Sequence, residues 1–335
     1  MSRATIVDIA NELKISPSTV SRALRDHPDI SKKTKHRVIE AAERLDYFPD
    51  SLAQGLKSRK TNTIGIIVPE IRHHYFSSAI SGIEEVTYRS DFTIMVCQSN
   101  EDCRREEINL RALVSNRVAG LLISISQTTT AGTHFDILHK RGIPIVFFDR
   151  INDSIKGSQV IVNDYQGAYD AVSHLAEKGY KRIAHIAGPS TISIGRDRFL
   201  GYRDALEQHD LPFTPELVVE GGFRENDGKA GIKRLLSLSI RPDAVFAVND
   251  PVAIGVYSIL KDKKLKIPED MALVGFSNNP ISALLEPPLT TVNQPSYEIG
   301  KTAASLLLEQ IHSDEKNPAP VIKEYQTQLI IRKSS

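Results

Sequence analysis

Apolar runs of strand length alternate with amphipathic helical segments along most of the chain, starting at Thr63. The first four runs read TIGIIV, FTIMVC, GLLISI and IPIVFF, and the next four read VIVN, RIAHIAG, AVFAVN and MALVGF. Continuous apolar runs indicate strands buried on both faces, and helices between them, such as 80–88 and 168–178, indicate parallel βαβ units. We therefore predict an α/β body of two similar lobes, each a doubly wound parallel sheet, with a ligand cleft at the carboxyl ends of the strands.

Length and composition narrow the class of protein. The chain has 335 residues, which suits two or three compact units, and its 41% apolar and 25% charged residues are ordinary for a globular protein. No apolar run approaches the ~20 residues of a membrane span, and the N-terminus lacks a secretory signal. Cys97 and Cys103 form neither a disulfide framework nor a metal-ligand spacing. We therefore expect a cytoplasmic protein with no metal, no cofactor and no membrane partner.

The charge of the chain is unevenly distributed. Residues 1–60 contain 12 Lys+Arg and 8 Asp+Glu, and the remainder contains 30 and 33, so a basic N-terminal part precedes a mildly acidic body. A basic segment favours binding to a polyanion such as DNA, although a charge of this size is common in other proteins.

Three short helices are predicted in the first 48 residues. Thr5 can cap a helix with Ile6, Ile9, Ala10 and Leu13 on one face. Ser16 can cap a second helix that begins at Pro17, where a missing N–H costs nothing, and Ser31 can cap a third. Two short helices across a tight turn, closed by a third, predict an all-α helix-turn-helix headpiece.

The outward face of the second helix carries short polar side chains and one long donor. These residues are Pro17, Ser18, Thr19, Ser21 and Arg22. Short hydroxyl side chains let a helix approach phosphates and base edges, and an arginine can bond guanine O6 and N7 together. A merely solvated face would more often carry Lys and Glu, so we predict that this face contacts DNA.

A marginal helix is predicted after the headpiece, over residues 51–57, with Asp50 as its cap and Ala53 and Leu56 on one side. So short a helix is not stable alone, and Gly55 weakens it by about 1 kcal/mol relative to Ala. We expect this segment to become ordered only against a partner.

The string TIVDIANELKISPSTVSRALRDHPDISKKTKHRVIEAAERLDYFPDSLAQGL resembles the headpiece of the lactose-repressor/galactose-repressor (LacI/GalR) family. Body strings such as RDRFLGYRDAL, AVFAVND and IPEDMALVGFSN resemble the same family, whose body is similar to periplasmic sugar-binding proteins, and together the matches cover nearly the whole chain. The resemblance implies that the second helix enters the major groove and that residues 50–57 form a hinge helix. It implies that Leu56 wedges into the minor groove. Asp50 departs from the family, which usually has Asn there.

The candidate DNA contacts are Thr5, Ser16, Pro17, Ser18, Thr19, Ser21, Arg22, Ser31, Ala53 and Leu56. The resemblance places effector contacts at Tyr75, Phe76, Asp149, Arg198, Phe223, Asn249, Asp250 and Ser277. Aromatic faces suit a sugar ring or a purine, and an arginine fork suits vicinal hydroxyls, a carboxylate or a phosphate.

Structural roles for several of these effector candidates stay open as alternatives. Phe76 can equally be a core residue, and Asp149 can be a turn cap paired with Arg150. Asn249 and Asp250 can cap the next helix, and Ser277 stands where many relatives have Asp.

These features predict a sequence-specific transcriptional regulator, of repressor type. It would bind a palindromic operator as a homodimer and be switched by a sugar-type effector between the lobes. No catalytic residue is assigned, because the chain has no phosphate loop, no GxGxxG after a strand and no GxSxG elbow. A sugar-binding transport component is a weaker alternative because of the basic headpiece, and a protein co-regulator in place of the effector stays open.

The predicted domains are a headpiece at 1–48, a hinge and linker at 49–60, and an effector-binding and dimerisation domain at 61–335. Within the last, the N-lobe is expected at about 61–160 and 293–318, and the C-lobe at about 161–292 and 319–335. The end of the chain, LIIRKSS, is strand-like and carries no leucine heptads, which favours a dimer over a tetramer.

Overall fold

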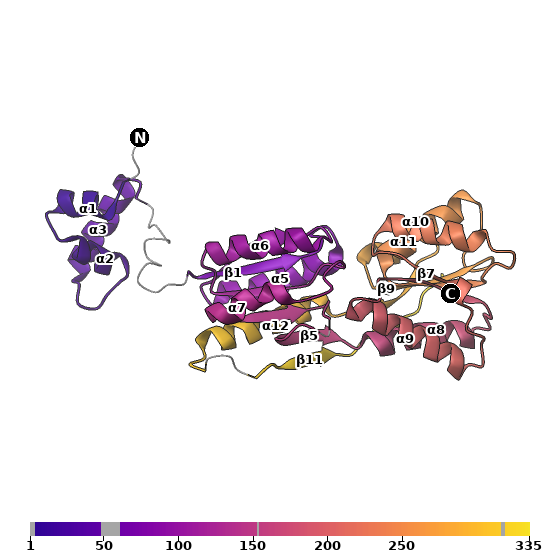
Figure 1. Ribbon diagram of the computed structural model, residues 1–335. Helices are drawn as coiled ribbons and strands as arrows, with labels where there is room; N and C mark the ends of the chain where they lie inside the picture. The colour runs from indigo at the N-terminus through magenta and orange to yellow at the C-terminus, as the bar shows by residue number, and fades with distance from the viewer. Residues whose placement is uncertain (1–3, 48–60, 153, 316–318) are drawn as a thin grey trace. The chain divides into compact units, whose positions relative to one another are not determined.

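The computed structural model describes residues 4–47, 61–152, 154–315 and 319–335. It consists of two compact units, Met1–Thr61 and Asn62–Ser335, which are drawn in Figure 1.

The N-terminal unit is a three-helix headpiece made of α1 (Ile6–Leu13), α2 (Pro17–Leu24) and α3 (Lys32–Arg44). Thr5, Ser16 and Ser31 cap these helices, as the sequence predicted. Its small core consists of Ile9, Ala10, Val20, Ala23, Val38, Ala41 and Ala42. The helix-turn-helix prediction is confirmed, whereas the predicted hinge helix at 51–57 lies outside the described residues.

The first lobe of the second unit is built on one parallel sheet with the strand order β11-β5-β4-β3-β1-β2. Its strands are β1 (Thr63–Val68), β2 (Thr93–Gln98), β3 (Gly120–Ile123), β4 (Ile145–Phe148), β5 (Ser158–Val162) and β11 (Ile322–Tyr325). Its helices are α5 (His74–Arg89), α6 (Cys103–Ser115), η1 (Thr133–Phe135), α7 (Asp136–Arg141) and α12 (Ser296–His312).

The second lobe repeats this design with the strand order β12-β10-β9-β8-β6-β7. Its strands are β6 (Ile183–Ala187), β7 (Val218–Glu220), β8 (Ala244–Ala247), β9 (Ala272–Ser277), β10 (Thr290–Asn293) and β12 (Gln328–Ile330). Its helices are α8 (Asp164–Glu177), α9 (Ser193–Gln208), η2 (Pro215–Leu217), α10 (Glu225–Leu236), α11 (Asp250–Asp262) and η3 (Pro280–Ala283).

Alternate strand residues pack on opposite faces of each sheet, which is why the strands read as continuous apolar runs. In β3, Leu122 packs with residues of α5 and α12, whereas Leu121 and Ile123 join the cluster that contains residues of α6 and α7. In the second lobe, Phe246 of β8 packs with α8 and α9, whereas Val245 joins residues of α10 and α11. The predicted fold class is therefore confirmed.

Three details of the second unit differ from the sequence prediction. The run VIVN, which we grouped with the strands of the second lobe, belongs to β5, and β5 pairs in parallel with β4 in the first sheet. We predicted that residues 319–335 belong wholly to the C-lobe, but β11 pairs in parallel with β5 in the first sheet, so the chain returns to the second lobe only after Tyr325. The sequence of β11, IKEY, is half-polar because it is an edge strand, and it therefore gives no apolar-run signal. In addition, β12 pairs antiparallel with β10, so the second sheet is not wholly parallel.

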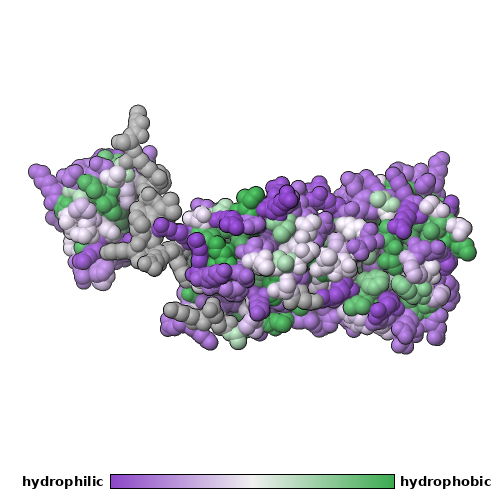
Figure 2. All heavy atoms as spheres, in the orientation of Figure 1, coloured by the Kyte–Doolittle hydropathy of each residue, from purple (hydrophilic) through white to green (hydrophobic). Residues whose placement is uncertain are grey.

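The surface of the second unit is largely polar. On the face shown in Figure 2, hydrophobic residues form small separate patches among hydrophilic ones. None of the helices in the described ranges is long and apolar enough to cross a membrane.

Each sheet has a topological switch point where the strand order reverses, because β1 lies between β2 and β3, and β6 lies between β7 and β8. Ligands of such sheets bind beyond the carboxyl ends of the strands at this point. Residues that follow the strands of the two lobes touch one another: Ser193 N–H donates to Ile151 O at 2.9 Å, and Arg224 Nη2 donates to Asn100 Oδ1 at 2.8 Å. The strand ends of both lobes therefore border a common cleft.

Candidate nucleic-acid interface and ligand cleft

Hydroxyl groups gather at the N-terminus of α2. Ser16 Oγ accepts a hydrogen bond from Thr19 N–H at 3.1 Å and lies 2.8 Å from both Ser18 Oγ and Thr19 Oγ1. The first turn of a helix also presents free N–H groups and the positive end of the helix dipole. This end of α2 is therefore suited to receive a phosphate group.

The two sides of α2 differ in burial. Val20 and Ala23 are buried in the headpiece core, whereas Ser18 and Arg22 are exposed. Within the described residues, the side chain of Arg22 has neither a hydrogen-bond nor an ion-pair partner, so its guanidinium is available to a base or a phosphate. Pro17 is exposed, and Thr19 and Ser21 are half-buried on the edges of the same face.

The other candidate DNA contacts lie at helix starts or beyond the described residues. The Thr5 hydroxyl donates to Asp8 at 2.7 Å, and the hydrogen bonds from Thr5 hold the pKa of Asp8 below its usual value. Ser31 Oγ accepts from Thr34 N–H at 3.2 Å and is exposed. Ala53 and Leu56 fall within residues 48–60, which are not described.

Aromatic rings from both lobes meet one arginine in the cleft. Tyr75 and Phe76, in the first turn of α5, are buried, with their rings edge to face at 5.3 Å. The guanidinium of Arg150, which follows β4, lies 5.5 Å from the ring centre of Phe76 and 4.2 Å from that of Phe223, which follows β7. Arg150 therefore joins the two lobes through cation–π contacts.

Arg150 is held from the first lobe by carboxylates. Its Nη1 donates to both oxygens of Glu101 at 2.7 and 2.8 Å, and its Nε lies 3.6 Å from Asp149 Oδ2. Burial raises the pKa of Asp149 to about 6, although the positive charge of Arg150 opposes this rise. We named Asp149 from the sequence but did not assign Arg150 or Glu101. The position of Arg150, directly after a buried strand, was the available signal.

Arg198, the predicted effector anchor, is fully engaged within the second lobe. Its Nε donates to Asp164 Oδ1 at 2.8 Å, its Nη1 donates to Val248 O at 2.5 Å, and it stacks 3.6 Å from the ring centre of Phe276. Burial raises the pKa of Asp164, and the charge of Arg198 opposes that rise. The ion pair ties α9 to the start of α8.

Asn249 and Asp250 also have their polar atoms satisfied inside the second lobe. Asn249 Oδ1 accepts from Val252 N–H at 2.9 Å and caps α11, while its Nδ2 donates to Phe223 O at 3.0 Å. The fully buried Asp250 accepts from the Asn279 N–H and from the hydroxyls of Ser282 and Thr291 at 2.6–2.7 Å. Burial raises the pKa of Asp250 to about 6.

Ser277 ends β9 in a half-buried position, with φ at +109°. This left-handed backbone directs the chain out of the strand end, and Asn278 follows with φ at +49°.

Buried polar atoms without a hydrogen-bond partner are concentrated in the cleft. Within the described ranges, the cleft members of this group are both ring nitrogens of His73, Tyr75 Oη, Ser99 Oγ, Gln127 Oε1 and Arg150 Nε. An unsatisfied buried polar group costs about 1–3 kcal/mol, so these atoms are suited to form hydrogen bonds with water or with a ligand in the cleft.

The protonation states of His73 and Tyr75 determine which hydrogen bonds these two side chains can donate or accept. Burial, aided by the charge of Arg150, lowers the pKa of His73 to about 4, so its imidazole is neutral and has one donor and one acceptor. Burial, with a further contribution from Asp149, raises the pKa of Tyr75 well above its usual value, so its hydroxyl keeps its proton. His73 was not among our sequence candidates.

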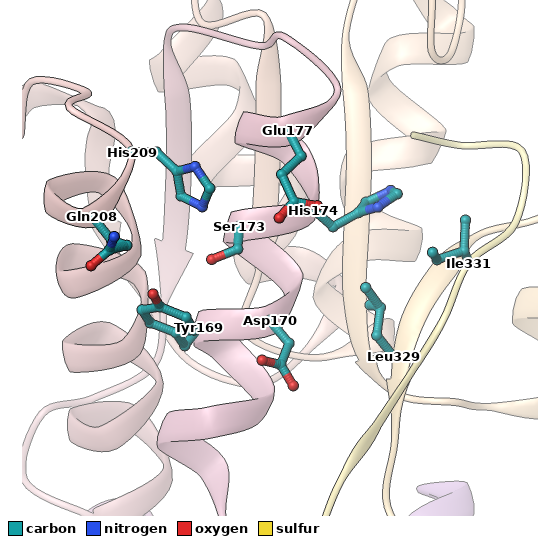
Figure 3. Close-up of a pocket in the computed structure, with 9 residues that line it drawn as sticks. All are labelled: Tyr169, Asp170, Ser173, His174, Glu177, Gln208, His209, Leu329 and Ile331. Carbon is teal, nitrogen blue, oxygen red and sulfur yellow. The ribbon is translucent and has the colours of Figure 1, made fainter.

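The pockets of the second unit include one at the cleft and one away from it. One, of about 250 Å³, opens at the cleft and is lined by Glu70, Arg72, His73, Phe223, Arg224, Glu225, Pro251, Ile254, Asn279 and Ile281. The other, of about 490 Å³, lies among α8, α9 and β12, and Figure 3 shows its lining residues. The smaller pocket includes the aromatic ring of Phe223 and the unpartnered ring nitrogens of His73.

An ion pair spans the mouth of the cleft. Arg224, at the start of α10, donates from Nε to Glu70 Oε2 at 3.2 Å and from Nη2 to Asn100 Oδ1 at 2.8 Å. Since Glu70 and Asn100 follow β1 and β2, these bonds hold the second lobe to the first.

Comparison with known proteins gave consistent matches. Residues 5–50 match the family described as "Bacterial regulatory proteins, lacI family", and residues 172–335 match the "Periplasmic binding protein-like domain". The chain is 33% identical, over 334 residues, to the "HTH-type transcriptional repressor PurR" of Aliivibrio fischeri (strain MJ11), covering 99% of this chain and 98% of that protein.

Two solved structures are similar to the chain over nearly its whole length. One is a "transcriptional regulator CelR-cellobiose complex", with a TM-score of 0.75 and 27% identity, covering 99% of this chain and 100% of the other. The other is a Lac repressor dimer bound to operator and an anti-inducer, with a TM-score of 0.84 and 24% identity over 99% of both chains, which is a likeness of fold.

Proposed function

The chain belongs to the lacI family of bacterial regulatory proteins, and we propose that it represses transcription by binding a roughly palindromic operator as a homodimer. We propose further that a small molecule of sugar type binds between the two lobes and changes its affinity for DNA. The regulator has no catalytic role in this scheme, and it acts in the cytoplasm.

The exposed face of α2 supports the DNA-binding half of the proposal. Ser16, Ser18 and Thr19 surround the N-terminus of the helix with hydroxyls, and Arg22 extends from the next turn without a partner among the described residues. Phosphate contacts at a helix start fix the position of the helix, and one exposed arginine in the groove reads a guanine. We assign these roles to the hydroxyl cluster and to Arg22, respectively.

The homodimer follows from how little DNA a single headpiece can read. One recognition helix contacts only a few base pairs, which is too few for selection within a genome. Two copies on a two-fold symmetric site double that number. The Lac repressor, which shares the fold, is described as a dimer on its operator.

The single observation that carries the effector proposal is the cluster of unpartnered polar atoms in the cleft beside Phe76 and Phe223. Arg150 Nε can only donate and Gln127 Oε1 can only accept, whereas the hydroxyls and the neutral imidazole can do either. A molecule rich in hydroxyl groups satisfies both kinds, and its apolar ring faces suit the two aromatic rings. The similar CelR structure is described as a cellobiose complex.

A thermal-shift screen against neutral sugars, sugar phosphates, sugar acids and purines tests the effector proposal. A ligand at 100 times its dissociation constant stabilises the folded protein by about 2.7 kcal/mol, which gives a readily measured shift. The hit should then change the affinity of the full-length protein for duplex DNA in a fluorescence anisotropy titration. A ligand that stabilises the protein but leaves DNA affinity unchanged would refute the switching role.

Arg22→Ala tests the DNA-binding face, with the exposed neighbour Arg25→Ala as the matched control. Selected operators compared with single-base variants should show that Arg22→Ala loses about 1–3 kcal/mol of discrimination at one position. Equal weakening on every sequence would instead make Arg22 a phosphate contact.

Sedimentation of the protein on the same DNA, with two chains expected per site, checks the homodimer.

A further inference from the structure

Three side chains with metal-binding chemistry lie together outside the effector cleft. Cys103 and Glu106 lie three residues apart in the first turn of α6, and His134 belongs to η1, which follows the loop after β3. The thiol sulfur, a carboxylate oxygen and an imidazole nitrogen all lie within 4.8 Å of one another, and His134 Nε2 is 2.9 Å from Glu106 Oε1. Glu106 is fully buried, and the side chain of His134 is only 9% exposed.

We propose that Cys103, Glu106 and His134 bind a divalent transition-metal ion of the Zn²⁺ type, with water as a further ligand. Zn²⁺ takes thiolate, imidazole and carboxylate ligands at about 2.0–2.3 Å, which puts the ligand atoms of a tetrahedral site roughly 3.4 Å apart. The spacing in this cluster is close enough that small side-chain adjustments would form the site. The mixture of sulfur, nitrogen and oxygen donors favours Zn²⁺ or Co²⁺ over Mg²⁺ and Ca²⁺, which prefer oxygen alone.

The surroundings hold the carboxylate in place for such a role. Glu106 Oε2 accepts from Ser126 N–H at 2.7 Å, and Oε1 accepts from the Thr129 hydroxyl at 2.8 Å. Outer hydrogen bonds of this kind orient ligand side chains and raise metal affinity. The bond from His134 to Glu106 is the one that a metal ion would replace, because binding needs the lone pair of Nε2.

A purely structural role for the cluster is the competing interpretation. Glu106 already has three hydrogen-bonding neighbours, so the cluster could serve only to tie the loop after β3 to α6. That interpretation gives the Cys103 thiol only its contact with Thr129, the residue that also bonds Glu106. It predicts that no metal binds and that Cys103→Ser changes nothing but packing.

Cobalt binding to the full-length protein, without a histidine tag and freed of metal by a chelator, distinguishes the two interpretations. We expect one equivalent of Co²⁺ per chain, with visible bands of a four-coordinate ion and a near-ultraviolet sulfur-to-cobalt band, both removed by added Zn²⁺. Cys103→Ser should abolish the sulfur-to-cobalt band, and His134→Ala should weaken binding at least tenfold.

Matched controls make the result specific to these residues. Cys97→Ser removes the other thiol, which lies on β2, and His139→Ala removes a histidine on α7; neither belongs to the cluster. Both should bind Co²⁺ like the parent protein, and circular dichroism should show that all four variants are folded. Absence of stoichiometric binding, or a sulfur-to-cobalt band that survives Cys103→Ser, would overturn the proposal. The readout needs neither DNA nor effector, so it is independent of the proposed function.

Discussion

The two lobes have the same strand order, but their polar residues at the cleft are used differently. In the first lobe, residues that follow the strands, including His73, Ser99 and Gln127, have buried atoms with no hydrogen-bond partner among the described residues. In the second lobe, Asn249 and Asp250 occupy equivalent strand-end positions, and their side-chain atoms are bonded within the lobe; Gln294, which follows β10, is the exception among its described strand-end residues, because its Nε2 has no hydrogen-bond partner.

This difference distinguishes polar residues that can bind the effector from polar residues that stabilise the fold. A buried polar atom whose partners lie inside the protein stabilises the fold, whereas one without a partner destabilises it until a ligand arrives. We therefore infer that the first lobe, together with Phe223, provides most of the effector contacts. The second lobe contributes the other side of the cleft, which is held in place by the hydrogen bonds of Asp250 and by the Arg198–Asp164 ion pair.

Asp250→Ala should give the largest effect, because it leaves three buried donors without an acceptor. At about 1–3 kcal/mol for each orphaned group, and with partial relaxation, we expect a loss of about 4 kcal/mol in unfolding free energy. Urea unfolding of the full-length chain, followed by circular dichroism, measures it. Asp250→Asn keeps the size and one acceptor oxygen, and should lose about half as much. Normal stability combined with lost effector binding would contradict the architectural role.

His185 in the second lobe and His73 in the first lobe allow the two lobes to be compared by the pH dependence of stability. Burial lowers the pKa of His185, in the core of the second lobe, to about 4. In the unfolded chain the His185 imidazole binds a proton near pH 6.5, whereas in the folded chain it stays neutral until the pH is near 4. The free energy of unfolding is therefore highest above pH 6.5 and decreases as the pH falls toward 4. The loss is on the order of 3 kcal/mol for a change of this size.

His185→Phe should remove that part of the pH dependence, because its ring can still stack with Tyr202 and Phe246. Unfolding free energies at pH 7, 5.5 and 4 measure the slope. His73→Phe in the first lobe should remove a similar slope, since the pKa of His73 is also lowered to about 4, but only this variant should also weaken effector binding. An unchanged slope in both variants would show that neither imidazole stays neutral.

Tyr75→Phe should separate ligand binding from stability. Within the described residues, the Tyr75 hydroxyl has no partner at hydrogen-bond distance, although the Asp149 carboxyl lies near enough to raise its pKa, so removal of the hydroxyl should change unfolding free energy by less than about 0.5 kcal/mol. If the effector bonds this hydroxyl, affinity should fall roughly tenfold, which isothermal calorimetry would show. Tyr202→Phe is the control: its hydroxyl donates to Ile183 O at 2.8 Å, so it should lose about 1 kcal/mol of stability and no affinity. The reverse pattern would place the recognition surface in the second lobe.

Arg224→Ala should give the smallest effect. Its bonds to Glu70 and Asn100 join the lobes, but its side chain is 41% exposed, and an exposed ion pair contributes about 0.2–1 kcal/mol. Effector affinity should fall about two- to fivefold at low salt, and the difference should shrink as salt is added. Arg72→Ala is the comparison, because Arg72 also lines the cleft pocket and also pairs with Glu70, but within the first lobe. Equal effects of the two variants would indicate that Arg224 does not act as a bridge between lobes.

Local sequence signals were sufficient for much of the fold. Thr5, Ser16 and Ser31 cap the helices they were predicted to cap, because capping depends on residues only a few positions apart. The eight apolar runs form strands, because burial on both faces leaves a continuous apolar pattern. Edge strand β11 was missed because its pattern is half-polar and its place depends on the distant β5.

The sequence by itself therefore determined the fold class, the headpiece and the general positions of the strand-end residues. Only the tertiary structure decided which of these side chains have hydrogen-bond partners within the protein and which do not. Arg150 meets Glu101 and Phe223 only because separate strand ends converge, and Cys103 and Glu106 meet His134 only because the loop after β3 returns to α6. Hydrogen bonds and desolvation depend on distances of a few ångströms between residues far apart in the chain, and no local pattern encodes those distances.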